Sequence, residues 1–366
     1  MKNNKKEGFG MRRLLLIDGS SLLTTSFYGN VPREYYGAKT EADRKKALGK
    51  LMQTSTGEYT NGVYTFCRTL LKILEKQKPS HLAVAWDVSR ETFRRKLYPE
   101  YKGHREETKP ELSSQFKLTQ DVLEAMNVRQ FMLEEYEADD IIGTIAKQFE
   151  KEIPVYIYTR DQDALQLVSE YTRLWLVTNK ADAMTKEAFA GLDKKIINKF
   201  NLPDNVFEFT PLWVEEFYGL TPLQLIDKKA LEGDKTDNIP GVKGVGEKSA
   251  TPLIKEFGSI ENLYEHIEGL SKKEEKEMRE FMKELGIKRP PLANLLKESE
   301  DELCGKKAAF LSKQLATIDT NINELEGMEL EELKLKLNKE GMKEIFEELE
   351  FKSLLAELNK KGEEDE

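Results

Sequence analysis

The chain has 366 residues, of which 39% are hydrophobic and 34% are charged, and its formal net charge is −9 at pH 7. This length and composition predict two or three domains with real cores and long solvated helices. The apolar run that begins at Leu14 is stopped at once by Asp18, which excludes a signal-peptide core. No run approaches the roughly 20 apolar residues that a membrane span needs. The two cysteines, Cys67 and Cys304, have no metal-binding spacing, so we expect a cytoplasmic protein.

The negative net charge does not by itself exclude nucleic acid as a partner. What matters for such binding is whether basic residues gather on one face. A metal-dependent nuclease must also carry its own acidic site.

Two apolar runs near the N-terminus end in an acid. Residues 12–18 are predicted to be a buried strand that ends in Asp18, and residues 82–87 a second one that ends in Asp87. Between them, residues 62–76 carry apolar side chains at helical spacing. Alternation of strands and helices favours a parallel sheet with helices on its faces.

The stretch 136–163 carries the densest group of acids. Three of them stand at the start of a predicted helix over 137–149, and two follow the strand-like run VYIY; they are Glu137, Asp139, Asp140, Asp161 and Asp163. Like charges so close repel strongly at low dielectric, which points to a cation among them. Oxygen ligands without His or Cys suit Mg²⁺ or Mn²⁺.

Each acid alone has an ordinary explanation. Acids at a helix N-terminus favour the helix dipole, and an Asp after a strand is a common turn residue. The site hypothesis depends on convergence, because sites in parallel sheets gather at the carboxyl ends of the strands. Asp18, Asp87, Asp161 and Asp163 all fall at such ends, and the front of the 137–149 helix can reach the same edge.

Residues 88–120 are rich in charge and poor in core pattern. Tyr98 and Tyr101 lie among the basic residues Arg90, Arg94, Arg95, Lys96, Lys102, Arg105 and Lys109. Cations for phosphates and rings for bases are what a groove for single-stranded nucleic acid needs. A solvated segment of mixed charge remains an alternative, although a loop of this length inside a domain is usually functional.

Residues 211–270 form a different, helical unit. Asp234 and Asp237 lie one helical turn apart. A glycine-rich hairpin follows, with Gly241, Lys243, Gly244, Gly246 and Lys248. Backbone N–H groups and a helix N-terminus in such a hairpin can meet a phosphate. A plain helix–helix turn is the alternative. Residues 271–366 alternate charged amphipathic helices with loops, and we find no chemistry there.

Five motifs together resemble the bacterial 5′-nuclease family, which includes the 5′–3′ exonuclease domain of DNA polymerase I, its stand-alone relatives and flap endonucleases. In chain order they are LLLIDGSS, AWDVSRETFRRKLYPEYKGHR, YEADDIIGTIA, TRDQDALQL and GDKTDNIPGVKGVGEKSA. The resemblance runs from about Leu14 to Leu270. It implies a PIN-like α/β fold, with a central, mainly parallel sheet flanked by helices, a helix-three-turn-helix DNA-binding region and a helical C-terminal extension.

The resemblance also implies domain limits. We expect a catalytic domain over 11–205 with a helical arch at about 88–120, a DNA-binding domain over 206–290 and a charged extension over 291–366 whose last residues are disordered.

The resemblance further assigns residues to roles. The implied two-metal carboxylates are Asp18, Asp87, Glu137, Asp139, Asp140, Asp161, Asp163, Asp234 and Asp237. The first four are expected at one ion, and Asp140, Asp161, Asp163 and Asp237 at the other. Arg94 and Lys102 are expected to stabilise charge on the scissile phosphate. The expected DNA contacts are Arg94, Tyr101, Lys102 and Arg105 in the arch and Gly241, Lys243, Gly244, Gly246 and Lys248 in the hairpin, where relatives bind K⁺.

Three features depart from the family pattern. Thr25 stands where many relatives have an Arg, Arg160 replaces a usual small residue, and the polar stretch 30–61 is longer than is typical.

We therefore expect a monomeric, structure-dependent 5′–3′ exonuclease and flap endonuclease. It would hydrolyse DNA and RNA–DNA primers in replication and repair with two Mg²⁺ ions, for which Mn²⁺ can substitute. One alternative is a metal-dependent ribonuclease of related fold, which would have no need of the hairpin. The other is a DNA-structure-binding protein without catalysis, which predicts missing carboxylates.

Overall fold

The protein is described here from a computed structural model that covers residues 11–192 and 201–364. Its centre is a six-stranded sheet in the order β3-β2-β1-β4-β5-β6. The strands are β1 (Met11–Asp18), β2 (Pro79–Trp86), β3 (Arg129–Met132), β4 (Val155–Thr159), β5 (Thr172–Val177) and β6 (Val206–Phe209). All neighbouring pairs are parallel except β5 and β6. The mainly parallel α/β fold expected from the sequence is confirmed.

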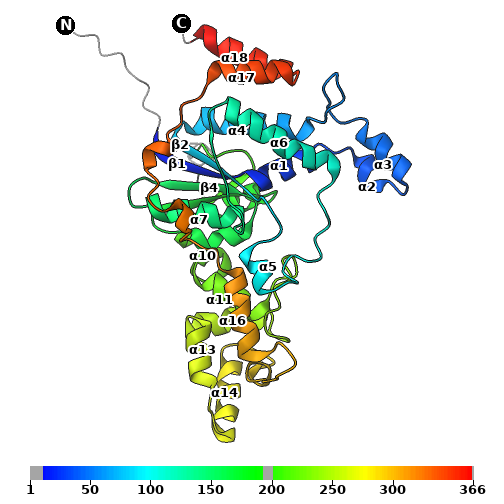
Figure 1. The fold of residues 1–366 in the computed structure, drawn as a ribbon. Coiled ribbons are helices and arrows are strands. Elements are labelled where there is room, and N and C mark those ends of the chain that lie inside the picture. Colours follow the sequence, from blue (N-terminus) through cyan, green and yellow to red (C-terminus); the bar gives the residue numbers. More distant parts are fainter. Residues whose placement is uncertain (1–10, 193–200, 365–366) are drawn as a thin grey trace, which may run out of the picture.

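Strand β1 is buried on both faces, which explains its unbroken apolar run. Leu15 and Ile17 pack into one core with helices α1 (Gly19–Tyr28), α4 (Asn61–Gln77) and α6 (Pro110–Ala125). Leu14 and Leu16 face the other core, which contains α7 (Ala138–Phe149). This alternation follows from the period of two along a strand, and Figure 1 shows helices covering both faces of the sheet.

The register of the central strands brings the acidic ends together. Asp18 pairs with Ala85 of β2, and Ile17 pairs with Tyr158 of β4. The acids that follow β1, β2 and β4 therefore lie at one edge of three adjacent strands. Helix α7 begins at the same edge, because the N–H of Ala138 donates to Asp87 at 3.0 Å.

A helical region extends away from this edge of the sheet (Figure 1). Its core is formed by residues such as Leu231, Leu253, Leu263, Met282 and Leu292. Its helices are α11 (Gln224–Glu232), α12 (Glu247–Phe257), α13 (Ile260–Ile267), α14 (Lys272–Glu284), α15 (Leu292–Leu295) and α16 (Gly305–Ala316).

Shorter helices complete the two lobes. They are α2 (Arg33–Gly37), α3 (Glu41–Leu48), α5 (Phe93–Leu97), α8 (Ala181–Ala188), α10 (Pro211–Tyr218) and the 3₁₀ turn η1 (Gln162–Leu167). Figure 1 shows α2 and α3 projecting beyond the sheet, within the polar stretch 30–61.

The predicted domain limit at 205/206 lies just before strand β6. Strand β6 completes the sheet, and Val214 of α10 packs into the same core as β1. The run VFEF has only four residues, too few for its pattern to distinguish a strand from a loop. In the structure it is a strand because it pairs antiparallel with β5.

The residues of the predicted extension over 291–366 pack in two places. Its first part, α15 and α16, belongs to the helical region. The chain then returns along the α/β domain, where the N–H of Leu335 donates to the carbonyl of Ser80 at 2.9 Å. Helices α17 (Lys339–Glu348) and α18 (Lys352–Glu364) close the opposite end, with Phe346 and Phe351 in its core.

Helix α18 reaches Glu364, and the last two residues, 365–366, on which the predicted disordered end falls, lie outside the described part of the chain. Among the helices that the structure describes, none is long and apolar enough to cross a membrane.

Candidate active site

A cavity of about 1030 Å³ opens at the acidic edge of the sheet, where the helical region begins. Eight of the nine predicted carboxylates line it, namely Asp18, Asp87, Glu137, Asp139, Asp161, Asp163, Asp234 and Asp237. The ninth, Asp140, is fully buried elsewhere. Residues more than 200 positions apart are thus brought to one place.

Asp18 is fixed by the turn from β1 into α1. Its carboxylate accepts hydrogen bonds from the N–H of Ser21 and from the hydroxyl of Thr159, both at 2.8 Å. Burial and the neighbouring Asp87 raise the pKa of Asp18 to about 7, against these two hydrogen bonds. The Asp18 side chain is therefore held in place, and its carboxyl group is stabilised by binding either a proton or a cation.

Asp139 points into the same cluster from the first turn of α7. Its Oδ1 is buried and has no hydrogen-bond partner among the described residues. Burial, followed by Asp161, Asp18 and Asp87, raises its pKa well above the ordinary range. A buried polar atom without a partner is costly, and a divalent cation would satisfy it.

The donor set fits such a cation. It consists of carboxylate oxygens, which Mg²⁺ and Mn²⁺ prefer. Among the residues that the structure describes, no three His, Cys, Asp or Glu side chains already form a group that could hold an ion. An ion would therefore have to draw the carboxylates together or bind some of them through water, as Mg²⁺ commonly does.

A second acidic group lies on the helical side of the cavity. Asp163 and Asp234 both accept a hydrogen bond from Lys229 of α11, at 2.7 Å for Asp234. Burial raises the pKa of Asp163 to about 6, although Lys229 opposes the rise. Burial would also raise the pKa of Asp234, but Lys229 and backbone N–H groups lower it overall.

Lys229 was missed by the sequence reasoning. The run IDKKALEGD places Lys228 and Lys229 on one helix ahead of the acids, and periodicity does not say which one faces them. In the structure Lys228 pairs with Glu232 instead, at 2.7 Å.

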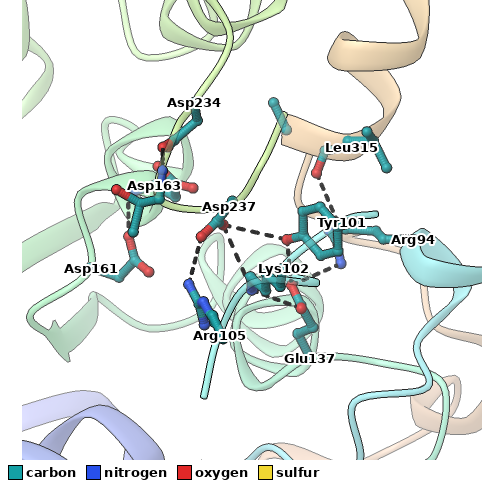
Figure 2. Close-up of polar contacts among 12 residues, drawn as sticks. Arg94, Tyr101, Lys102, Arg105, Glu137, Asp161, Asp163, Asp234, Asp237 and Leu315 are labelled. Atoms are coloured by element: carbon teal, nitrogen blue, oxygen red, sulfur yellow. Dashed lines mark hydrogen bonds and ion pairs between the residues drawn. The ribbon is translucent and has the colours of Figure 1, made fainter. Parts of the chain in front are cut away.

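The base of the arch (residues 88–120) closes the cavity from the other side. The Lys102 Nζ lies 2.7 Å from Glu137 Oε1 and 3.7 Å from Asp237 Oδ2. The Arg105 Nη2 lies 2.5 Å from Asp237 Oδ1. The N–H of Lys102 also donates to the carbonyl of Asp237 at 2.8 Å. Figure 2 shows these cations converging on the two acids.

Tyr101 is buried at this junction, with 3% of its surface exposed. Its hydroxyl donates to Glu137 at 3.1 Å (Figure 2). The ring is therefore not presented to a base, which departs from the predicted DNA contact.

Arg94 and Asp140 occupy places different from those predicted. Arg94, 2% exposed, donates two parallel hydrogen bonds of 2.7 Å to Asp140, which is 0% exposed. Arg94 also donates to the carbonyls of Leu315 and Thr317, at 2.9 and 2.6 Å. The pair therefore joins the arch base, α7 and the returning C-terminal segment, and neither residue lines the acidic cavity.

Asp140 also caps helix α7. Glu137 and Asp140 form a reciprocal capping box at the start of α7. The usual sequence signature is Ser or Thr at the N-cap with Glu or Gln three positions later, and Glu137 with Asp140 is an acidic variant of it.

The glycine hairpin also has a defined shape. Gly241 adopts φ +60°, and a Cβ there would come within 2.3 Å of the Gly233 backbone nitrogen. The N–H of Gly241 donates to Ser312 of α16 at 2.9 Å. Beyond it, Lys243, Gly244 and Lys248 are exposed. Gly246, also exposed, is the N-cap of α12, which leaves a helix N-terminus open to an anion.

Two solved structures share this fold. A T5 5′-exonuclease with bound zinc is 19% identical, with a TM-score of 0.56, over 92% of this chain and 99% of that one. A bacteriophage T5 flap endonuclease in a pseudo-enzyme–product complex with DNA and metal ions is 18% identical, with a TM-score of 0.55, over 93% and 100%. At these identities the likeness shows the fold.

Comparison with sequence families shows which family the chain belongs to. Residues 13–193 match the N-terminal resolvase-like domain of 5′-3′ exonuclease, and residues 220–341 match its C-terminal SAM fold. The chain therefore belongs to the 5′–3′ exonuclease family.

The chain is also similar to much longer relatives. DNA polymerase I of Bacillus subtilis (strain 168) is 36% identical over 95% of this chain and 32% of its own length. DNA polymerase I of Streptococcus pneumoniae (strain ATCC BAA-255 / R6) is 36% identical over 95% and 33%. The chain spans about a third of these curated relatives.

Proposed function

We propose that this protein is a structure-dependent 5′ nuclease that hydrolyses phosphodiester bonds of DNA, and of RNA–DNA primers, at a junction between single and double strands. The observation that carries the proposal is the unpartnered, buried Oδ1 of Asp139 among Asp18, Asp87 and Asp161. A buried carboxylate oxygen without a partner is costly, and a cation bound among these four acids would offset that cost.

The acids that line the cavity fall into two groups, and we assign one ion to each group. Asp18, Asp87, Glu137 and Asp139 are the proposed ligands of one ion, and Asp161, Asp163, Asp234 and Asp237 of the other, directly or through water. We leave Asp140 out, because Arg94 and backbone N–H groups occupy both of its oxygens. Bound Mg²⁺, or Mn²⁺ in its place, would lower the pKa of a water and neutralise charge on the phosphate.

The residues of the chain itself position the substrate. Lys102 and Arg105 line both the acidic cavity and a second cavity of about 670 Å³ under the arch. A scissile phosphate at this boundary would replace Glu137 and Asp237 as the ion-pair partner of Lys102 and Arg105. Arg90, Arg95 and Lys117 line the arch cavity, which suits the backbone of the 5′ strand.

Tyr101 and Arg94 act from behind the site. The Tyr101 hydroxyl orients Glu137, and the Arg94–Asp140 pair fixes the start of α7 against the C-terminal segment. Both are positioning residues in this proposal.

The hairpin is the proposed grip on the duplex. Lys243 and Lys248 would contact phosphates, and the turn at Gly241 and Gly244, where φ is positive and no side chain projects, would let the backbone come close to the DNA strand. K⁺ at the hairpin, a monomeric state and a cytoplasmic location remain part of the proposal. The last is supported by the bacterial DNA polymerases to which the chain is similar.

The test is cleavage of a 5′-labelled flap duplex by the wild type and by Asp139→Asn, with Mg²⁺ or with EDTA. We expect cutting at the junction only for the wild type with metal. Tight binding without cutting in either metal would favour a non-catalytic structure-binding protein. Cutting of single-stranded RNA alone would favour the ribonuclease.

A further inference from the structure

A third cleft, of about 340 Å³, adjoins the acidic cavity on a different face of α1. Ser21, Thr25 and Arg160 line both spaces, whereas the arch cavity meets the acidic one at Ser20 and Thr24. The walls of the cleft are α1, α4, the ends of β4 and β5, and residues 203–205.

The cleft is strongly basic in an acidic protein. Arg68, Lys72, Lys76 and Arg160 line it, and Asp204 is its single acid among the described residues. Asp204 pairs with Lys76 at 2.8 Å. The side chains of the other three cations form no ion pair within the described part of the chain, and all are exposed.

The three cations on α4 are regularly spaced. Arg68, Lys72 and Lys76 are four residues apart, so they lie on one face with a rise of about 6 Å per step. Arg68 is additionally held over the ring of Tyr64, at 5.7 Å. Like charges in a row repel one another, and a chain of phosphates along the helix would relieve that repulsion. A single small anion would leave the outer charges unmatched.

We propose that this basic cleft binds the phosphodiester backbone of the uncut strand, opposite the flap, next to the junction. The inference rests on the proposed function. The cut strand enters the arch cavity from one face of α1, so the continuous strand must leave the junction by another route. Arg160, which lines both cavity and cleft, is placed to contact its phosphate nearest the junction.

The test measures binding without cleavage, in EDTA or Ca²⁺, by fluorescence anisotropy. The variant carries Arg68→Gln, Lys72→Gln and Arg160→Gln. A matched control carries Lys151→Gln, Lys343→Gln and Lys352→Gln, three exposed lysines that line none of the three cavities. Because all six side chains are exposed, we expect both variants to have the same Tm as the wild type.

We expect the cleft variant to bind the flap duplex at least tenfold more weakly, with a salt slope of log Kd reduced by about three. Neutral methylphosphonate linkages in the uncut strand beside the junction should weaken binding of the wild type but not of the variant. An equal loss in the control, an unchanged salt slope, or sensitivity only to methylphosphonates in the cut strand would overturn the proposal. If neither wild type nor control binds the flap, the proposed function itself fails.

Discussion

Lys229 offers the sharpest test of how the acidic cavity is stabilised. Its ammonium group lies between Asp163 and Asp234, and the three side chains are each about one-fifth exposed. Lys229→Gln keeps most of the length of the side chain and removes its charge. The two carboxylates would then face each other without a counter-charge in the metal-free protein.

The cost follows from the geometry. At an effective dielectric constant of about 20, opposite unit charges 2.7 Å apart attract by about 6 kcal/mol. Most of this is offset by the desolvation of the ions. Exposed pairs contribute up to about 1 kcal/mol and loss of one partner of a buried pair costs about 3–5 kcal/mol. For this partly buried group we expect about 2 kcal/mol, or a fall in Tm of a few degrees.

A divalent ion should reverse the effect. Because Lys229 no longer competes for Asp163 and Asp234, the variant should gain more stability from Ca²⁺ or Mn²⁺ than the wild type does. A gain of about 1.4 kcal/mol corresponds to tenfold tighter binding of the second ion.

The assays are calorimetric melting in EDTA and in Ca²⁺, and titration with Mn²⁺. Lys228→Gln is the control, since Lys228 pairs with Glu232 and Glu247 instead of the two aspartates. Equal melting in EDTA and equal Mn²⁺ affinity for wild type and Lys229→Gln would refute the reasoning.

Three further predictions concern stability. Arg94→Met should cost about 3–5 kcal/mol in urea unfolding, because it leaves the buried Asp140 charge unpaired; adding Asp140→Leu should recover much of the loss, and strict additivity of the two changes would count against the pair. Burial raises the pKa of Asp18 to about 7, above its unfolded value of about 3.9, so the folded state binds the extra proton and the metal-free protein should lose stability as the pH rises from about 4 to about 7. Asp18→Asn should flatten that decline in Tm measured against pH in EDTA, and an unchanged profile would contradict the assignment. Gly241→Ala should destabilise the helical region and weaken duplex binding, because φ is +60° and the added Cβ meets the backbone at Gly233; a variant with wild-type Tm and affinity would show that the turn tolerates the change.

The sequence predicted the fold and the acidic edge because both depend on local patterns. Buried runs such as residues 14–17 identify parallel strands, and a site at their carboxyl ends follows from topology. Strand β3 and strand β6 were missed because each has four residues, too few for a period to show.

The ion-pair partners of the charged residues could not be predicted from local sequence patterns. Arg94 lies within a basic segment that resembles a DNA-binding arch, yet its guanidinium is buried by residues 315–319, more than 200 positions away. Lys229 is unremarkable in its helix until the fold brings Asp163 to it. Long-range pairing of this kind has no periodic signal, and only the capping box at Glu137 and Asp140 left a local trace.

Two adjacent acids permit the most direct test of the central claim. Asp139 has an unpartnered oxygen in the cavity, whereas the oxygens of Asp140 are bound by Arg94 and backbone N–H groups. The measurement is the single-turnover rate of junction cleavage of a 5′ flap in Mg²⁺, per folded molecule, for Asp139→Asn and Asp140→Asn. We predict that Asp139→Asn keeps its fold and its flap binding but cuts at least about a hundredfold more slowly, since several kcal/mol of metal-assisted stabilisation are lost. Asp140→Asn should be less stable and yet cut at close to the wild-type rate. Wild-type cutting by Asp139→Asn, or equal loss in both variants, would contradict the assignment of the catalytic centre.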